Sequence, residues 1–283
     1  AATTQLDKRV LDEMIPFMVE NYGNPSSIHK HGREVKTSVE NSRNKIADIL
    51  GVTPGEIFFT SGGTEADNTF IINAIYSRKI KTAITSKIEH HAVLHTLEDL
   101  EKKNVIKILY VNLDSNGHID YNHLEELISS NPKSLISLMH GNNEIGNITN
   151  IERVAEVCNT NDSIFHSDTV QTIGHFNINL SSNIIHSIVG SAHKFHGPKG
   201  IGFMYINNKI KIPPYIIGGS QERNMRGGTE NVSGIIGLSK AFEITVEEKI
   251  KTKKHIENLK FNMIEMLKRN IKNLMFNGDC DNS

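Results

Sequence analysis

The stretch "KTAITSKIEHHAVLHTLEDLEKKNVIKILYV", residues 81–111, combines two hydrophobic patterns. Residues 81–86 and 106–111 are short runs rich in β-branched and aliphatic side chains, which favour strands. Between them, residues 91–103 show the apolar spacing of an amphipathic helix. Two strands joined by such a helix pair in parallel, because the helix carries the chain back along the sheet. We therefore predict a βαβ unit here.

The same alternation extends over most of the chain. Further strand-like runs lie at residues 56–60, 134–139 and 163–168, and further helical patterns at residues 64–76, 121–130 and 151–159. Repeated βα units build a mostly parallel sheet that is covered by helices. We therefore predict an α/β fold with a mostly parallel central sheet flanked by helices.

The pattern changes after Lys194. The run "GIGFMYI", residues 200–206, follows a turn at Pro198 and leaves too little chain for a crossover helix, so we predict an antiparallel strand. A long amphipathic helix is expected from Gly234 onward. The final segment, "LMFNGDCDNS", has the pattern of a strand that enters a turn.

These changes suggest two domains. Residues 1–233 form the large, ligand-binding domain, and residues 234–283 form a linking helix and the start of an incomplete small α/β domain. The N-terminal segment, residues 1–20, is expected to pack with the small domain. The chain starts without methionine and stops soon after the small domain begins, so we expect it to be cut at both ends.

Composition excludes several classes of function. The 283 residues carry 31 Lys and Arg against 32 Asp and Glu, a formal charge of −1, so no basic face for nucleic acid is expected. No apolar run approaches the roughly 20 residues that cross a bilayer, and no secretory signal opens the chain, so we expect a cytoplasmic protein with no membrane contact. Two cysteines without CxxC spacing support neither a disulfide scaffold nor a thiolate zinc site.

In an open α/β sheet, ligands bind where loops leave the carboxyl ends of the strands. The first such loop, in "FFTSGGTEADN", places Gly62, Gly63 and Thr64 at a helix start, where free N–H groups suit a phosphate. A simple glycine turn with Thr64 as N-cap explains the same residues equally well.

The second loop, in "SKIEHHAVLH", holds three histidines. His91 and His95 have the i, i+4 spacing of a metal pair, but the glutamate of a zinc protease helix is missing, so we predict no metal. His90 is either a surface residue or a ring that stacks on a planar ligand.

Two more loops carry polar side chains. Asn142 and Asn143 in "MHGNNEIG" are hydrogen-bonding groups without charge, and paired asparagines are also common turn formers. Asp168 closes the strand in "FHSDTVQTIG", with Gln171 three residues later. An acid at this place suits a metal, a ribose or a protonated ring nitrogen.

The fifth loop, "SAHKFHGPKG", places Lys194 between two histidines before a glycine–proline turn. A lysine confined by sheet and loop is desolvated, which lowers its pKa and frees the amine as a nucleophile that forms imines. Together with Asp168 for a pyridinium and a Gly/Thr helix start for a phosphate, this lysine matches pyridoxal phosphate. A sixth string, "NMRGGTEN" with Arg226 and Thr229, suits phosphate or substrate contacts, or a flexible loop.

The ordered motifs resemble the cysteine desulfurases of the class V aminotransferase superfamily, which are fold-type I enzymes. The resemblance covers nearly the whole chain and rests on "AATT", "YGNPSSIHKHG", "FTSGGTEADN", "SKIEHHAVL", "HGNNEIG", "HSDTVQTIG", "SAHKFHGPKGIG", "GGSQERNMRGGTENV" and "NGD". It implies pyridoxal 5′-phosphate as cofactor, bound in the large domain.

The resemblance also implies a role for each matching residue. Lys194 holds the cofactor as an imine and moves the substrate's α-proton, and Asp168 keeps the pyridine nitrogen protonated. His90 stacks on the ring, Gln171 contacts the phenolic oxygen, and Asn143 lies near that oxygen and the substrate carboxylate. The implied phosphate-binding residues are Gly63, Thr64, Ser191 and His193, with Thr229 reaching the neighbouring subunit's phosphate in a homodimer, and the implied substrate-binding residues are Asn143, Thr3 and Arg226.

In that family, L-cysteine becomes L-alanine, and the sulfur passes as a persulfide to a loop cysteine and then to an acceptor or iron–sulfur scaffold protein. The loop cysteine and a substrate-carboxylate arginine fall beyond Ser283. Cys158 lies on an apolar helical face, which indicates packing, and Cys280 falls too early in the motif order. We therefore expect this chain, tested alone, to bind the cofactor but to release little sulfur. The alternatives are a selenocysteine or cysteine lyase, a class V aminotransferase, or an inactive scaffold of the same fold.

Overall fold

The computed structural model describes residues 2–182 and 184–279. At its centre is a sheet of seven described strands, in the order β1-β7-β6-β5-β4-β2-β3. The strands are β1 Ile57–Thr60, β2 Thr82–Thr85, β3 Lys107–Tyr110, β4 Leu135–Ser137, β5 Ile164–Asp168, β6 Ser187–Ser191 and β7 Gly202–Ile206. This confirms the predicted α/β class with a mostly parallel sheet.

Only one strand of this sheet opposes the rest. β7 pairs antiparallel with both β1 and β6, whereas β2, β3, β4, β5 and β6 pair in parallel with their neighbours. The antiparallel strand predicted at residues 200–206 is therefore confirmed. Because β7 reverses the direction twice, β1 runs the same way as β6. The carboxyl ends of six strands consequently lie at the same edge of the sheet.

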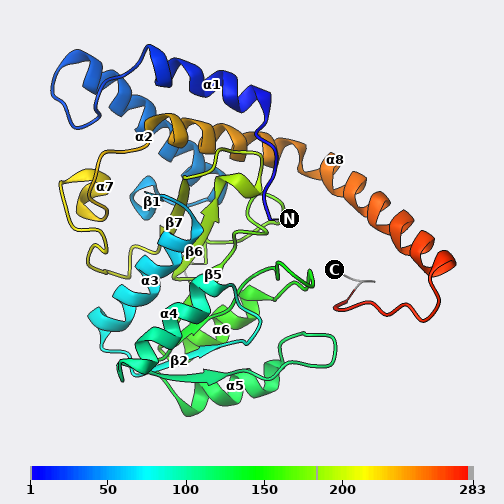
Figure 1. Ribbon diagram of the computed structural model, residues 1–283. Helices are drawn as coiled ribbons and strands as arrows, with labels where there is room; N and C mark the ends of the chain where they lie inside the picture. The colour runs from blue at the N-terminus through cyan, green and yellow to red at the C-terminus, as the bar shows by residue number, and fades with distance from the viewer. Residues whose placement is uncertain (1, 183, 280–283) are drawn as a thin grey trace.

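Helices cover both faces of the sheet (Figure 1). The helices are α2 Lys30–Leu50, α3 Gly63–Arg78, α4 His91–Lys102, α5 Tyr121–Ser130 and α6 Ile151–Thr160. Side chains of α3 and α4 pack on one face, with Phe58, Leu135 and Val189 of the sheet. Side chains of α2, α5 and α6 pack on the other face, with Phe59 and Phe165 among their partners. Successive side chains of a strand point to opposite faces of the sheet, so the two faces carry separate cores.

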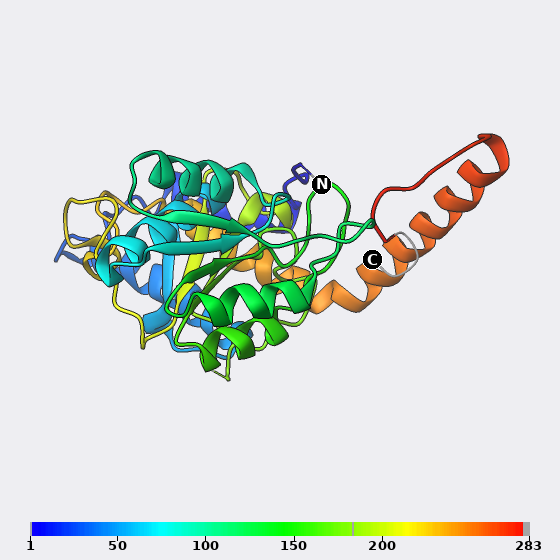
Figure 2. The same cartoon turned by 90° about the horizontal axis from the view of Figure 1, so that it is seen from below.

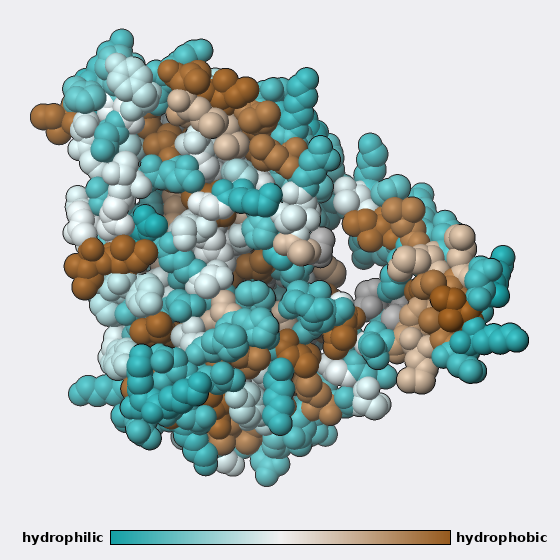
Figure 3. Space-filling model, viewed as in Figure 1, coloured by the Kyte–Doolittle hydropathy of each residue, from teal (hydrophilic) through white to brown (hydrophobic). Residues whose placement is uncertain are grey.

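Helix α8 (Val232–Asn270) is the longest element. Its first half is buried on the sheet domain and packs beside α1 (Lys8–Val19) and α2, while its outer half extends away from the body of the molecule (Figure 2). Apolar side chains gather over α1 and along this outer half (Figure 3), and the exposed ones on α8 are Ile250, Ile256, Leu259, Phe261, Met263 and Met266. None of the described helices is both long and apolar enough to span a bilayer.

The prediction of a strand near the C-terminus is wrong. Residues 274–276 have no regular structure, and Met275 is 85% exposed. A strand needs a neighbour for its N–H and C=O groups, and no described strand lies alongside this segment. The chain instead returns to the sheet domain, where Asp279 N donates to Asn147 Oδ1 at 3.0 Å. The expected turn at Cys280 lies outside the described residues.

Candidate active site

The strand ends converge on one cavity of about 520 Å³. Since β1, β2, β4, β5 and β6 end at the same edge, the loops that follow them meet there. Nine of the residues expected from the sequence line the cavity: Gly63, Thr64, His90, Asn143, Asp168, Gln171, Ser191, His193 and Lys194. Five loops that are far apart in sequence therefore build a single site.

Helix α3 begins at the floor of the cavity. Gly63 is its first residue, and a Cβ there would lie 2.7 Å from Val170 Cγ2, closer than two carbon atoms can pack. A larger residue would therefore require Val170 or the start of the helix to move. The free N–H groups of this first turn, beside Thr64 and Ser191, form a cradle for an anionic oxygen.

Lys194 lies in a short 3-10 helix, η2 (Ala192–Lys194), directly after β6. Its side chain is half-buried at the cavity wall, and burial lowers the pKa of the amine, while the nearby Asp168 carboxylate opposes that change. The N-terminal segment fixes this turn, because Thr4 N donates to His193 O at 2.9 Å. Lys194 is thus held by the sheet, by its own turn and by the N-terminal segment of the chain.

Asp168 is the last residue of β5 and is 6% exposed. Its Oδ1 accepts a 2.9 Å hydrogen bond from Val170 N. Burial raises the pKa of the carboxyl, and the Val170 N–H and the charge of Lys194 counteract part of that increase. A cation in the cavity would act in the same direction as this charge, so this acid suits a protonated ring nitrogen.

His90 is the N-cap of α4, and its Nδ1 accepts from Ala92 N at 3.1 Å. The hydrogen of the neutral ring is therefore on Nε2, at the side that faces away from the helix. His91 and His95 lie instead on the exposed face of α4 with ring centroids 4.7 Å apart, and the described residues place no third metal ligand with them.

The two adjacent asparagines have different functions. Asn142 is the turn former: its Oδ1 accepts from the N–H groups of Glu144 and Ile145, and its Nδ2 donates to Ile88 O at 2.7 Å. Asn143 lines the cavity, and its Nδ2 donates to Glu144 Oε1 at 2.6 Å. The residue chosen from the sequence, Asn143, is the one that the turn presents to the site.

Three residues chosen from the sequence do not line the cavity. Thr3 lies at its rim, where Thr3 Oγ1 is 3.2 Å from His193 Nδ1. Arg226 and Thr229 line a separate pocket of about 100 Å³. The Arg226 guanidinium forms an ion pair with Glu65 at 3.0 Å, and Glu65 follows Thr64 in the first turn of α3.

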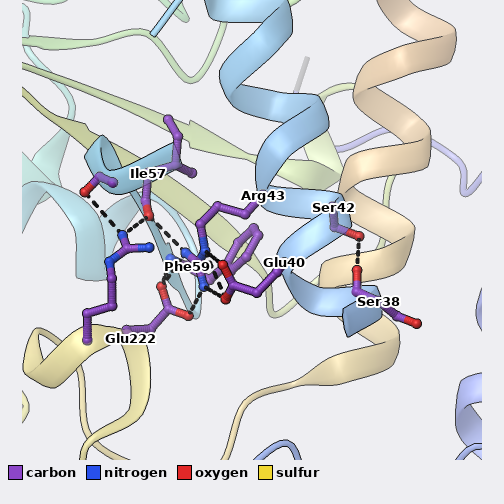
Figure 4. Close-up of polar contacts among 9 residues, drawn as sticks. Ser38, Glu40, Ser42, Arg43, Ile57, Phe59 and Glu222 are labelled. Atoms are coloured by element: carbon purple, nitrogen blue, oxygen red, sulfur yellow. Dashed lines mark hydrogen bonds and ion pairs between the residues drawn. The ribbon is translucent and has the colours of Figure 1, made fainter. Parts of the chain in front are cut away.

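A buried ion pair anchors the segment that carries Arg226 and Thr229. Figure 4 shows Arg43 of α2 reaching Glu222, with Nη1 and Nη2 donating to the two carboxylate oxygens at 2.8 and 2.7 Å. Each side chain is 2% exposed, and Phe59 N also donates to Glu222. Glu222, Arg223 and Asn224 have φ values of 45°, 56° and 67°, a left-handed run that costs energy in residues other than glycine.

Sequence reasoning missed several residues that line or support the cavity: Ala2, Asp67, Met139, Glu144 and Val170 in its wall, and Glu89 behind it. Glu89 accepts from Ser86 Oγ at 2.6 Å and from Met139 N at 2.8 Å, so it joins the loops after β2 and β4. Burial raises the pKa of Glu89 to about 8. The sequence offered one signal for Glu89, which is an acidic residue directly before His90.

Cys158 lies in α6 and is fully buried, as its apolar helical face predicted. Burial raises the pKa of its thiol, which makes the thiolate scarce at neutral pH. It is therefore a packing residue.

The comparisons with known proteins agree with this geometry. Residues 1–282 match the aminotransferase class-V family. The chain is 44% identical over 284 residues to a cysteine desulfurase IscS of Dictyoglomus turgidum, covering 100% of this chain and 72% of the relative. It is 41% identical over 285 residues to a cysteine desulfurase IscS of Clostridium botulinum strain Hall, with 100% and 71% coverage.

Solved structures give the same result. A NifS-like protein superposes with a TM-score of 0.91 at 43% identity, covering 95% of this chain and 74% of that one. A structure described as SspA in complex with cysteine superposes with a TM-score of 0.81 at 35% identity, covering 86% and 70%.

Fold and site together define an enzyme of the class V aminotransferase family that depends on pyridoxal phosphate. The cavity fits that cofactor, because it offers an amine at Lys194, a buried acid at Asp168 and a glycine cradle at the start of α3. Within this family, the chain belongs to the cysteine desulfurases.

Proposed function

We propose that the protein removes the sulfur of L-cysteine, leaving L-alanine, and transfers it as a persulfide to a thiol for iron–sulfur cluster or thio-cofactor synthesis. The names of the relatives and the cysteine in a related structure support this choice of substrate. The observation that carries the proposal is the meeting of Lys194, Asp168 and the start of α3 at one cavity.

The cofactor would be held by residues already in place. Asp168 would face the ring nitrogen, His90 the ring plane and Gln171 the phenolic oxygen, and the phosphate would take Gly63, Thr64, Ser191 and His193. When bound, pyridoxal phosphate withdraws electrons from the Cα atom of an amino acid. Asn143 and Thr3, at the cavity and its rim, are proposed to orient the substrate carboxylate.

The chain's own groups would then move protons. Lys194 Nζ has a lowered pKa, so a larger fraction of neutral amine is available at pH 7 to accept the proton from the substrate's Cα and to return it later. His90 presents Nε2–H as a donor, because its Nδ1 is occupied by Ala92 N. The buried Cys158 does not take the sulfur.

A homodimer forms part of the proposal. Arg226 and Thr229 lie in a pocket of their own and not in the cavity beside Lys194. Thr229 is proposed to complete the phosphate site of a neighbouring subunit, and a sulfur-acceptor or scaffold protein is the proposed partner.

The proposal is tested by replacing Lys194→Ala. We expect the wild-type protein to bind pyridoxal phosphate with a change in cofactor absorbance, and borohydride reduction followed by mass spectrometry to locate the cofactor on Lys194. The variant should show neither effect. The exposed Lys199 is the matched control, and Lys199→Ala should behave as wild type. A cofactor fixed to another lysine would contradict the proposal.

A further inference from the structure

Asp67 is a buried acid that the proposed function does not use. It lies in α3, one turn after Gly63, and its side chain reaches the wall of the cofactor cavity. The residue is 1% exposed. A carboxyl group in such a place requires either a cation or a proton, because an isolated buried charge is costly.

The neighbour of Asp67 is His166 of β5. Asp67 Oδ1 lies 3.4 Å from His166 Nε2, and within the described part of the chain both atoms are buried without a hydrogen-bond partner. His166 Nδ1 is 2.9 Å from Ser137 Oγ, and the His166 ring stacks on Phe70 with centroids 5.4 Å apart. Burial lowers the pKa of His166 to about 3, so the ring is neutral and supplies no cation.

Asp168 is the competing acid. His166 and Asp168 are two residues apart on β5, so both point toward α3. One carboxylate oxygen each of Asp67 and Asp168 and one ring nitrogen of His90 all lie within 4.8 Å of one another. Two carboxylates this close, in a buried site, do not both ionise at neutral pH.

The surroundings decide which acid keeps the proton. Asp168 receives the Val170 N–H and lies near the charge of Lys194. Asp67 has neutral His166 on one side, and the negative charge of Asp168 raises the pKa of Asp67 further, after burial has raised it first. The proton therefore belongs on Asp67, within reach of the unpaired His166 Nε2.

We propose that Asp67 is a positioning residue: it carries a proton at neutral pH, turns it toward His166, and so leaves Asp168 as the single anion under the cofactor's ring nitrogen. The inference rests on the proposed function only for the last step. A second anion at position 67 would drive a proton onto Asp168 and remove the group that holds the ring nitrogen protonated.

Infrared spectroscopy of the protein without cofactor tests the protonation directly. Protein labelled with ¹³C at the aspartate carboxyl should show a buried, protonated C=O band at pH 7 that shifts with the label. The band should disappear in Asp67→Asn and persist in Asp168→Asn. A band that is absent from the labelled wild type, or that is lost in Asp168→Asn but kept in Asp67→Asn, would overturn the proposal. If Asp67→Asn does not fold, the labelled wild type and Asp168→Asn still decide.

The effect on the cofactor is measured by ¹⁵N NMR with pyridoxal phosphate labelled at the ring nitrogen. Asn is a neutral group of the same shape as a protonated Asp, so Asp67→Asn should leave the ring-nitrogen signal unchanged, whereas Asp168→Asn should move it. A signal that moves equally in both variants would show that Asp67 bears charge and would reject the proposal. Failure of the protein to bind the cofactor would reject the proposed function and leave the infrared result intact.

Discussion

Glu89 shows how a single side chain can work without contacting substrate. It accepts hydrogen bonds from Ser86 on one side and from Met139 N on the other, so it joins the loop that carries His90 to the loop that carries Asn143. Burial raises its pKa to about 8, and the negative charge of Asp168 adds to that increase. The folded protein is therefore more stable when Glu89 holds a proton, because the cost of burying its charge outweighs the two hydrogen bonds, which favour the carboxylate.

This predicts a pH dependence of stability. A carboxyl whose folded pKa is about 8 and whose ordinary value is 4.5 contributes stability that is complete below pH 4.5 and is lost as the pH rises to 8. The loss is at most about 5 kcal/mol, since one pKa unit corresponds to about 1.4 kcal/mol. We expect Glu89→Gln to flatten the free energy of unfolding between pH 5 and pH 8, measured by urea denaturation. An unchanged slope in this variant would refute the assignment.

The difference between found and missed residues has a physical cause. Lys194 and Asp168 could be placed at the cavity from the sequence because they directly follow or close strands, and strand ends are recognisable in sequence. Asp67 and Glu89 were missed because their importance depends on burial against other elements, which the sequence does not show. Asn142 and Asn143 were found as a pair, but only the turn geometry separates their functions.

At the scale of elements, the start of α3 is set by close contact with the loop after β5. We predict that Gly63→Ala weakens pyridoxal phosphate binding, because the new methyl group would lie 2.7 Å from Val170 Cγ2 and would push the helix start away from the cavity. Fluorescence titration with the cofactor measures the loss. Gly55→Ala is the control, since a Cβ at that glycine has 3.7 Å to its nearest neighbour. Equal affinities of Gly63→Ala and Gly55→Ala for pyridoxal phosphate would contradict a phosphate site at the start of α3.

The ion pair between α2 and the segment after β7 allows a second prediction at this scale. Arg43→Met leaves the Glu222 carboxylate buried without its cation, so we expect the free energy of unfolding to fall by about 3–5 kcal/mol. Combining Arg43→Met with Glu222→Gln should restore part of that loss. Arg153→Met removes an exposed pair with Glu125 and should cost no more than about 1 kcal/mol. Urea denaturation measures the free energy of unfolding of these three variants and of the wild type. Similar losses in Arg43→Met and Arg153→Met would disprove the anchoring role of the buried ion pair.

Sequence patterns were most successful for these elements where hydrophobic periodicity is strong. The strands at residues 163–168 and 200–206 and the helix near Gly234 formed as expected. The strand near Met275 failed because a strand's hydrogen bonds depend on a partner that local pattern cannot supply.

For the whole molecule, the main prediction concerns two chains acting together. If Thr229 completes the phosphate site of the neighbouring subunit, each site takes Lys194 from one chain and Thr229 from the other. Lys194→Ala and Thr229→Ala then remove residues that different chains supply to a site. A mixed dimer of the two variants then contains one site with both residues intact. We expect such mixtures, after refolding together, to bind more pyridoxal phosphate at limiting cofactor concentration, measured by cofactor absorbance, than the mean of the separate variants. Binding equal to that mean would place Thr229 and Lys194 in the same subunit's site, or show that the protein acts as a monomer.

The left-handed run at Glu222, Arg223 and Asn224 has a consequence for the order of assembly. The carboxylate that holds it is joined to a guanidinium 179 residues earlier in the chain. A contact of such sequence separation closes late, because most of the sheet must already exist to bring its ends together. Until then, nothing offsets the unfavourable backbone of these residues. We therefore expect the segment with Thr229 to take its final shape after the rest of its own chain.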